Sequence, residues 1–272
     1  MPQSEYRIGS DMINPLDDAL IEFLIAISKK AGNAIMEFYD TEFLVRKKID
    51  NSPVTEADEK AESIIRLALN KRHPDIPFVG EEAYAKGHRP DLSGGLFWLV
   101  DALDGTKEFI QCRDEFTVNI ALVEFGNPIL GVVHAPAKQV TYWGSDAGAY
   151  LEEKNQGRRP IRTRVPSKNG LTVTMSHSHR ADEEEYLKDY NIKERTHSGS
   201  SLKFCFIAAG KADLYPRLGT TSEWDTAAGH AILSFAGGQM TGLDGTPIMY
   251  GKNNIKNPFF VARGQLIESI KA

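Results

Sequence analysis

The sequence has little cysteine. Only Cys112 and Cys205 occur among its 272 residues, which excludes a small domain held together by several disulfides. Two cysteines this far apart in an otherwise cysteine-poor chain favour a reducing compartment, although one bridge between them stays open. We therefore expect a cytoplasmic protein, and association with a membrane surface is left open.

Long hydrophobic runs are also lacking. The most apolar windows, such as residues 20–27 and 95–100, are much shorter than the roughly 20 residues that span a bilayer. The first residues carry acids and proline where an export signal has a basic start and an apolar run, so no export signal is expected. Without repeats or polar linkers, a chain of this length fits one large layered unit or two modest domains.

Positive charge is in the minority. Lysine and arginine number 32 against 37 aspartates and glutamates, which gives a net charge of −5. Proteins that bind nucleic-acid polymers through their phosphates are usually basic, so this class is excluded. Binding of a small phosphorylated ligand is not excluded, because a few cationic side chains, a helix N-terminus or a bound divalent cation supply enough local positive charge.

Helical and strand patterns are mixed along the chain. Apolar residues at helical spacing predict a long helix over 16–39 and a second helix within 51–73. A buried strand is expected at 96–100 and a hairpin at 117–124 and 129–134. The basic stretch 154–164 is typical of a solvated loop at the seam between two halves.

The second half continues the mixture. Strands are predicted at 171–175 and 212–215, and helices at 181–190, at 200–209 and from Trp224 onward. Helices and strands thus alternate irregularly around an antiparallel hairpin. The class is therefore α+β or mixed α/β rather than a regular repetition of βαβ units.

The strongest local signal is the segment WLVDALDGTKEF, residues 98–109. Its strand is expected to end at Asp101, and Asp104 follows just before Gly105 and Thr106. Carboxylates that converge across such a turn suit Mg²⁺. A helix that begins at Gly105 or Thr106 would point free amides at the same place and hold a phosphate oxygen. Considered singly, Asp104 is equally suited to capping that helix.

One similar motif leads to a different mechanism. An apolar strand followed by Asp-x-Asp-Gly-Thr is typical of haloacid-dehalogenase-type phosphatases, which use the first aspartate as a covalent nucleophile. Here Asp101 and Asp104 are three positions apart, so the two side chains cannot have the same relation to the strand. We therefore set that resemblance aside.

Further carboxylates stand at the starts of predicted elements. Glu81 follows a short strand-like run, Asp225 lies at a helix start, and Asp58 lies in the first turn of the second helix. Each one alone is usually a solvated residue or a helix cap. Together with the two aspartates of the turn, Glu81 and Asp225 offer enough oxygen ligands for two or more divalent ions, and such clusters hydrolyse phosphate esters in line.

With these segments in order, the chain resembles the inositol monophosphatase superfamily of Mg²⁺-dependent, Li⁺-sensitive phosphatases. The matching signatures are GEE at 80–82, DALDGTKEF at 101–109 and WDTAAG at 224–229. Within the superfamily the chain is most similar to the bacterial CysQ-type 3'(2'),5'-bisphosphate nucleotidases, through NSPVTEAD at 51–58, DGTKEFI at 104–110, EFTVNIALVEFGNPILGVVHAP at 115–136, GSSLKFC at 199–205 and LYPRLG at 214–219. One departure is Ala102, where the family commonly has a proline, and this relaxes one φ angle of the turn.

The resemblance implies a layered αβαβα fold of the sugar-phosphatase type. We expect an N-terminal α+β half, residues 1–155, with the metal-binding turn. A C-terminal α/β half, residues 156–272, would carry the substrate-side contacts within the same compact unit. The site would lie between the halves, as is usual for such junctions.

The resemblance also implies the metal ligands, which are carboxylates and one main-chain carbonyl: Glu81, Asp101, Leu103, Asp104 and Asp225. Glu81, Asp101 and the Leu103 carbonyl would bind one Mg²⁺. Asp101, Asp104 and Asp225 would bind a second, and Glu81 would share a third, weaker ion. The implied catalytic residues are Asp58, Glu81 and Thr106, of which Asp58 and Thr106 would orient and deprotonate the attacking water.

The implied substrate contacts come from both halves of the chain: Leu103, Asp104, Gly105, Thr106, His179, Ser200, Ser201, Lys203, Arg217 and Asp225. Lys203 and Arg217 supply positive charge suited to a phosphate that is bound but not cleaved. His177, His197 and His230 receive no metal role, because hard oxygen ligands already form the cluster.

The reaction implied is hydrolysis of adenosine 3',5'-bisphosphate to AMP and phosphate, with the sulfated analogue as a second candidate substrate. An alternative is another phosphatase of the same superfamily, acting on inositol phosphate, fructose bisphosphate or histidinol phosphate. A different class is a noncatalytic protein that binds nucleotide or metal. Asp58 and Thr106 speak against that class, because binding alone needs no water-activating pair.

Overall fold

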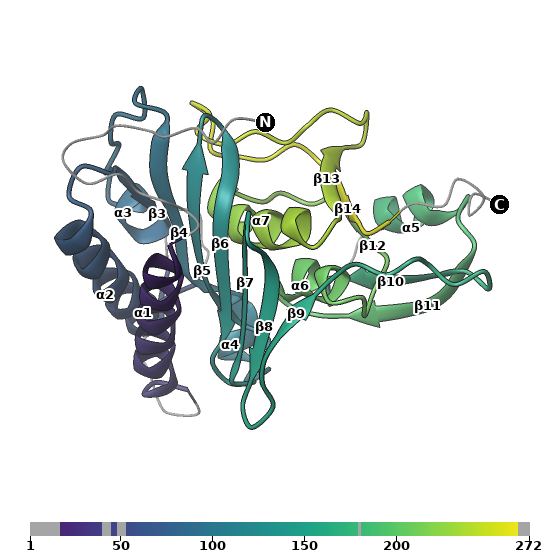
Figure 1. The fold of residues 1–272 in the computed structure, drawn as a ribbon, viewed down its shortest axis with the longest axis horizontal. Coiled ribbons are helices and arrows are strands. Elements are labelled where there is room, and N and C mark those ends of the chain that lie inside the picture. The colour runs from purple at the N-terminus through teal and green to yellow at the C-terminus, as the bar shows by residue number, and fades with distance from the viewer. Residues whose placement is uncertain (1–16, 40–44, 48–52, 179–180, 266–272) are drawn as a thin grey trace.

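The chain folds into five alternating layers of helices and sheets. The computed structural model describes residues 17–39, 45–47, 53–178 and 181–265. Two long helices cover one face of a large sheet, two further helices lie between this sheet and a smaller one, and a short helix lies on the outer side of the smaller sheet (Figure 1). This is the αβαβα order that the family resemblance implies.

The first layer consists of α1 (Asp18–Met36) and α2 (Glu56–Arg72). Asp17 caps α1, since its Oδ1 accepts a hydrogen bond of 2.9 Å from the amide of Ala19. The apolar residues of both helices pack on the large sheet and form one core with it. Both helices confirm the predicted periodicity. A short antiparallel pair, β1 (Val45–Lys47) and β2 (Pro53–Thr55), precedes α2.

The large sheet has seven strands in sequence order. They are β3 (Phe78–Gly80), β4 (Leu96–Asp104), β5 (Thr117–Glu124), β6 (Asn127–Ala135), β7 (Val140–Ser145), β8 (Gly148–Glu153) and β9 (Gly157–Ile161). Only β3 and β4 are parallel, and every other neighbouring pair is antiparallel. The predicted hairpin is therefore confirmed as β5 and β6.

Two expectations for this region are wrong. β4 does not end at the first aspartate but continues to Asp104, because pairing with β5 extends beyond the apolar run. The basic stretch 154–164 is not a loop, because it contains β9, which pairs with β8 at the edge of the sheet. The residues of β9 are mostly exposed, so this strand shows no hydrophobic pattern in the sequence. The predicted boundary at residue 155 falls in the turn that joins β8 to β9.

A β-bulge lies in the middle of the signature segment. Asp101 pairs with Asn119 and Asp104 pairs with Thr117, so a step of three residues in β4 faces a step of two in β5. Ala102 and the residue after it are both buried in the core toward α1 and α2. The bulge therefore lets both aspartates leave the strand on the opposite side, despite their odd spacing.

The smaller sheet has the order β11-β10-β12-β14-β13. Its strands are β10 (Leu171–Met175), β11 (Ile192–His197), β12 (Leu214–Arg217), β13 (Gln239–Gly242) and β14 (Phe260–Arg263). β10 is parallel to both β11 and β12, so the chain leaves β10 and β11 at the same edge of the sheet. The helix α5 (Ala181–Leu187) packs on its outer side.

The middle layer brings the C-terminal half against the large sheet. It contains α6 (Leu202–Ala208) and α7 (Ala227–Phe235), and a 3-10 turn, η1 (Glu223–Asp225), precedes α7. The main chain of α7 lies directly on β6, since a Cβ at Gly131 would come within 2.3 Å of the Ala228 carbonyl oxygen. This close approach fixes the start of α7, with Asp225, next to the end of β4.

Candidate active site

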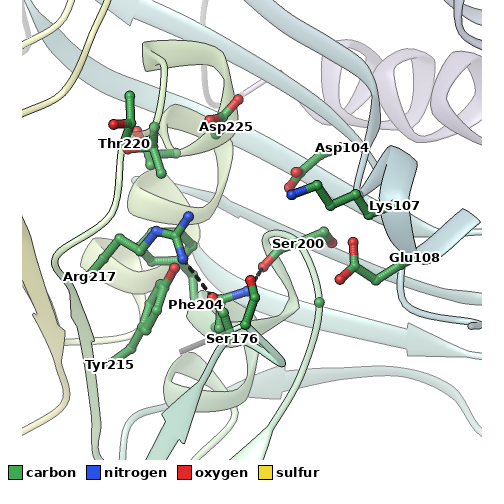
Figure 2. A pocket seen from close by; sticks show the side chains of 16 residues that line it. Asp104, Lys107, Glu108, Ser176, Ser200, Phe204, Tyr215, Arg217, Thr220 and Asp225 are labelled. Atoms are coloured by element: carbon green, nitrogen blue, oxygen red, sulfur yellow. Dashed lines mark hydrogen bonds between the residues drawn. The ribbon is translucent and has the colours of Figure 1, made fainter. Parts of the chain in front are cut away.

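A pocket of about 170 Å³ lies where the end of β4 meets the middle layer and the smaller sheet. Figure 2 shows Asp104, Lys107 and Glu108 on the side of the turn after β4, facing Arg217 and Tyr215 of β12. The pocket therefore takes its walls from both halves of the chain.

Three carboxylates converge beside this pocket. Glu81 is the first residue of α3 (Glu81–Ala85), Asp101 lies in β4, and Asp225 ends η1. One oxygen from each of them lies within 4.8 Å of the other two. We call these three residues the acidic wall. Sequence reasoning predicted each of them, and the structure brings all three together.

The acidic wall is electrostatically unfavourable without a cation. Burial, followed by repulsion from Glu81, Asp104 and Asp225, raises the pKa of Asp101 well above its usual range. Burial and the same kind of repulsion also raise the pKa of Asp225. A bound divalent cation would relieve both effects. The donor set consists of hard oxygens and fits Mg²⁺.

Asp104 also lines the pocket but is engaged differently. Its Oδ2 accepts hydrogen bonds from the amide of Ser201 at 2.8 Å, from the Ser201 hydroxyl at 3.1 Å and from the side-chain amide of Asn119 at 3.3 Å. Burial raises the pKa of Asp104 to about 6, although the charge of Lys203 and these hydrogen bonds act in the opposite direction. Asp104 is thus tied to the start of α6.

The turn after β4 is shaped by Gly105, which caps α4 (Thr106–Ile110) with a φ of 91°. This left-handed conformation is costly for residues with a side chain. The Thr106 hydroxyl donates to the Leu103 carbonyl oxygen at 3.3 Å, and the Leu103 amide donates to Oδ1 of Asp101 at 3.0 Å. The hydrogen bonds hold the turn without the family's proline.

Helix α2 carries two buried acids of the site, one turn apart. Asp58 is 2% exposed, and its charge contributes to the raised pKa of Asp101. Glu62 accepts from the amide of Glu82 at 2.6 Å and from that of Ala83 at 2.8 Å, which are free donors at the start of α3. Sequence reasoning missed Glu62. Its signal was an acid on the buried face of an amphipathic helix, four residues after Asp58.

Lys203 and Arg217 also line the pocket, and we call these two cations the basic wall. The buried ammonium of Lys203 donates to the carbonyl oxygens of Ser198 at 3.1 Å and Ser200 at 2.7 Å. Arg217 donates to the Ser176 hydroxyl at 2.8 Å, and its Nε has no hydrogen-bond partner in the described part of the chain. Burial lowers the pKa of Lys203 to about 8, although Asp104 acts in the opposite direction.

The predicted serines differ in their surroundings. Ser200 lines the pocket with a φ of 46°, and its hydroxyl lies 2.9 Å from that of Thr117. The Ser201 hydroxyl is buried and donates to the Asp225 carbonyl oxygen at 2.8 Å. His179 lies outside the described residues. The side-chain amide of Asn119 donates to the Ser201 hydroxyl at 2.9 Å. Sequence reasoning also missed Asn119, although a polar residue inside an apolar strand is a recognisable signal.

The histidines and cysteines have other surroundings. His230 is buried with Nδ1 at 3.0 Å from the Tyr250 hydroxyl, and burial lowers its pKa to about 4. His177 and His197 stack on one another, and His177 contacts Glu115. The two cysteines are both free thiols, Cys112 exposed and Cys205 buried, so the open question of a bridge between them is answered.

The chain belongs to the inositol monophosphatase family, whose model matches residues 16–269. It is similar to the 3'(2'),5'-bisphosphate nucleotidase CysQ of Escherichia coli strain K12, with 42% identity over 244 residues that cover 89% of this chain and 98% of that protein. The corresponding protein of Haemophilus influenzae is 30% identical over 92% of this chain and 94% of its own length. The predicted family is confirmed.

Solved structures agree with this assignment. CysQ of Bacteroides thetaiotaomicron, described as a bacterial member of the inositol monophosphatase family, superposes with a TM-score of 0.77 at 33% identity and covers 93% of this chain and 100% of that one. An IMPase of Thermotoga maritima gives a TM-score of 0.75 at 26% identity over 90% and 92% of the two chains. Among the described residues, none of the helices combines the length and the apolar character needed to cross a membrane.

Proposed function

We propose that this chain is a 3'(2'),5'-bisphosphate nucleotidase that hydrolyses adenosine 3',5'-bisphosphate to AMP and phosphate, with the sulfated analogue as a second substrate. The observation that carries the proposal is one pocket that is lined by both cations of the basic wall and by Asp225, which belongs to the acidic wall. Such a pocket suits a ligand with two phosphates, one at the metal site and one away from it. The similarity to CysQ proteins supports this choice over other members of the family.

Two Mg²⁺ ions would be held by the carboxylates of the pocket, and a third would bind more weakly. Glu81, Asp101 and the Leu103 carbonyl would hold the first, and Asp101, Asp104 and Asp225 would hold the second, while Glu81 would share the third. When bound, the ions would lower the pKa of a water molecule and neutralise charge on the phosphoryl oxygens. The raised pKa values of Asp101 and Asp225 support this assignment, because these two acids need a cation to remain ionised together.

The chain's own groups then position the water and the scissile phosphate. Gly105 lines the pocket at the start of α4, and the amides of Gly105 and Thr106 would donate to a phosphate oxygen. Thr106 with Asp58 would orient the water and remove its proton. The water would attack phosphorus in line with the leaving 3' oxygen, and no phosphoenzyme forms.

The phosphate that is not cleaved would lie against the basic wall. Lys203 and Arg217 would pair with it, and Ser200 would add a hydroxyl donor. His179 and Ser201 complete the proposed substrate side, together with Asp104 and Asp225. Both cations already have neutral acceptors, so this side exists before the substrate arrives. We place the protein in the cytoplasm, where its nucleotide substrate would be found.

The deciding experiment measures phosphate release from adenosine 3',5'-bisphosphate and from inositol 1-phosphate. Each is tested with Mg²⁺, with a chelator in its place, and with Mg²⁺ plus Li⁺. We expect the bisphosphate to be the better substrate, and we expect release to stop without Mg²⁺ and to fall with Li⁺. Faster release from inositol 1-phosphate would overturn the substrate assignment. Undetectable release from every ester at saturating Mg²⁺ would favour a binding protein instead.

A further inference from the structure

Glu115 lies between the turn after β4 and the segment that follows β11. It lies two residues before the start of β5, and a Cβ built at Gly105 would come within 3.2 Å of its carbonyl oxygen. A Cβ at Gly199 would come within 2.6 Å of the same oxygen. The main chain of Glu115 is thus packed between the turn after β4 and the segment that follows β11.

The side chain of Glu115 binds two segments of the smaller sheet's edge. Its Oε2 accepts from the amide of Gly199 at 2.9 Å and lies 2.6 Å from Nε2 of His177. Because an ionised carboxylate can only accept, Nε2 of His177 carries the hydrogen. The two partners come from the chain after β10 and the chain after β11, which run parallel and end side by side.

Both of these segments line the pocket. Ser176 and Ser178 flank His177, and Gly199 is followed by Ser200. The left-handed backbone of Ser200 carries the carbonyl that accepts from Lys203. Ser176 in turn accepts from Arg217. One carboxylate therefore contacts the two segments that hold the two cations of the basic wall.

We propose that Glu115 is a positioning residue that holds the basic wall at a fixed distance from the metal-binding turn and thereby sets recognition of the second phosphate. This inference rests on the proposed function. Glu115 has no place in proton transfer or in metal binding, so its removal should change substrate affinity rather than the rate of the chemical step.

The electrostatics agree with an ionised Glu115 carboxylate that holds the two segments together. Burial raises the pKa of Glu115, but the hydrogen bonds from His177 and Gly199 outweigh this effect and hold the pKa below its usual value. The carboxylate is therefore ionised at neutral pH, and hydrogen bonds to a charged acceptor are stronger than neutral ones.

The test compares Glu115→Ala and Glu115→Gln with wild type. For Glu115→Ala we expect the KM for adenosine 3',5'-bisphosphate to rise about tenfold, as for loss of a charge-assisted hydrogen bond, with kcat changed less than about twofold. The KM for adenosine 3'-monophosphate should change little. Glu115→Gln keeps an acceptor for the Gly199 amide, so its KM for adenosine 3',5'-bisphosphate should lie between those of wild type and Glu115→Ala. Glu185→Gln, which removes only an exposed pair with Lys188, is the matched control.

Hydrogen exchange tests the tie without any substrate. In Glu115→Ala, the amides of residues 198–201 should exchange faster, while the exchange rates of the α1 amides stay unchanged. A thermal unfolding curve should show that the variant is folded. Unchanged exchange there, or an equal rise in both KM values, would overturn the inference. If wild type releases no phosphate from the bisphosphate, the proposed function is wrong, and the exchange rates alone then decide the role of Glu115.

Discussion

The acidic wall and the basic wall differ in how their charges are stabilised. In the acidic wall, Glu81, Asp101 and Asp225 face one another, and burial and mutual repulsion raise the pKa of both aspartates. In the basic wall, Lys203 and Arg217 each donate to neutral oxygens of the protein. The acidic wall therefore requires a cation to be complete, whereas the basic wall is already held by the fold.

This difference separates what each wall contributes. A variant of the acidic wall should remove metal binding and the chemical step together, while relieving repulsion in the metal-free protein. A variant of the basic wall should weaken binding of one substrate class and leave the chemical step intact. The following experiments test that separation, from the largest expected effect to the smallest.

Asp101→Asn should have the largest effect. Losing this shared ligand should lower kcat by about 10³-fold, the scale at which preorganised charge stabilisation acts. Because one buried negative charge disappears, the metal-free variant should also melt higher than metal-free wild type, and Mg²⁺ should raise its melting temperature less. The exposed Asp91, whose carboxylate accepts from the amide and the hydroxyl of Ser93, provides the control variant Asp91→Asn. If the activity of Asp101→Asn is within tenfold of wild type, Asp101 is not a metal ligand.

Asp58→Asn should come next. If Asp58 removes the proton from the attacking water, kcat should fall by about 10²-fold, within the range of general base catalysis. The Mg²⁺ concentration for half-maximal activity should change little, because Asp58 would act on the water rather than on the ions. A large shift in that Mg²⁺ midpoint with kcat preserved would instead make Asp58 a metal ligand.

Lys203→Met should act on substrate choice. Removing one buried charge that pairs with a phosphate should raise the KM for adenosine 3',5'-bisphosphate by about tenfold or more. The KM for inositol 1-phosphate should stay within about threefold of the wild-type value, because this substrate has no second phosphate to contact Lys203. Lys211→Met, which changes a lysine that lies over Phe206, is the control. Equal effects on both substrates would show that the basic wall does not select the bisphosphate.

The charge of Lys203 also predicts a pH dependence. Its pKa of about 8 means that the ammonium loses its proton as the pH rises through 8, so the KM for the bisphosphate should increase above that pH. In Lys203→Met this part of the KM profile should be flat. The folded-state pKa lies below the unfolded value of about 10.4, so the unfolded chain binds the extra proton between these values and this residue's contribution to stability rises with pH there. A wild-type KM that is constant from pH 7 to 9 would contradict the assignment.

Glu62→Gln should give the smallest effect. A glutamine offers one acceptor where Glu62 offers two to the amides at the start of α3. Glu81 should become less well placed, and the Mg²⁺ midpoint should rise by about threefold to tenfold, the effect of losing one such hydrogen bond. The Mg²⁺-dependent rise in melting temperature should shrink in parallel. Glu59→Gln on the same helix, which removes a pair with Lys86, should leave both measurements unchanged.

Much of the site could be predicted because its residues stand where strands end or helices begin. Glu81 follows β3, and Asp225 stands just before α7, so short sequence patterns already locate them. The long helices were predictable from the spacing of their apolar residues, since one face of each is buried on a sheet.

The remaining features depend on contacts between distant segments. The exposed strands β9 and β11 carry no alternating pattern, so only pairing with β8 and β10 makes them strands. The roles of Glu62 and Glu115 depend on backbone amides that lie about 20 and more than 80 residues away along the chain. Local sequence patterns contain no information about such donors.

The bulge in β4 has a consequence for how such enzymes are told apart by sequence. Deleting a single codon at Ala102 would turn Asp-x-x-Asp-Gly-Thr into Asp-x-Asp-Gly-Thr. The shortened strand could still alternate regularly and pair with β5, because the extra residue has no partner in the ladder. One codon therefore separates this motif from that of phosphatases with an aspartyl nucleophile, and the distinction lies in a strand's hydrogen-bond register.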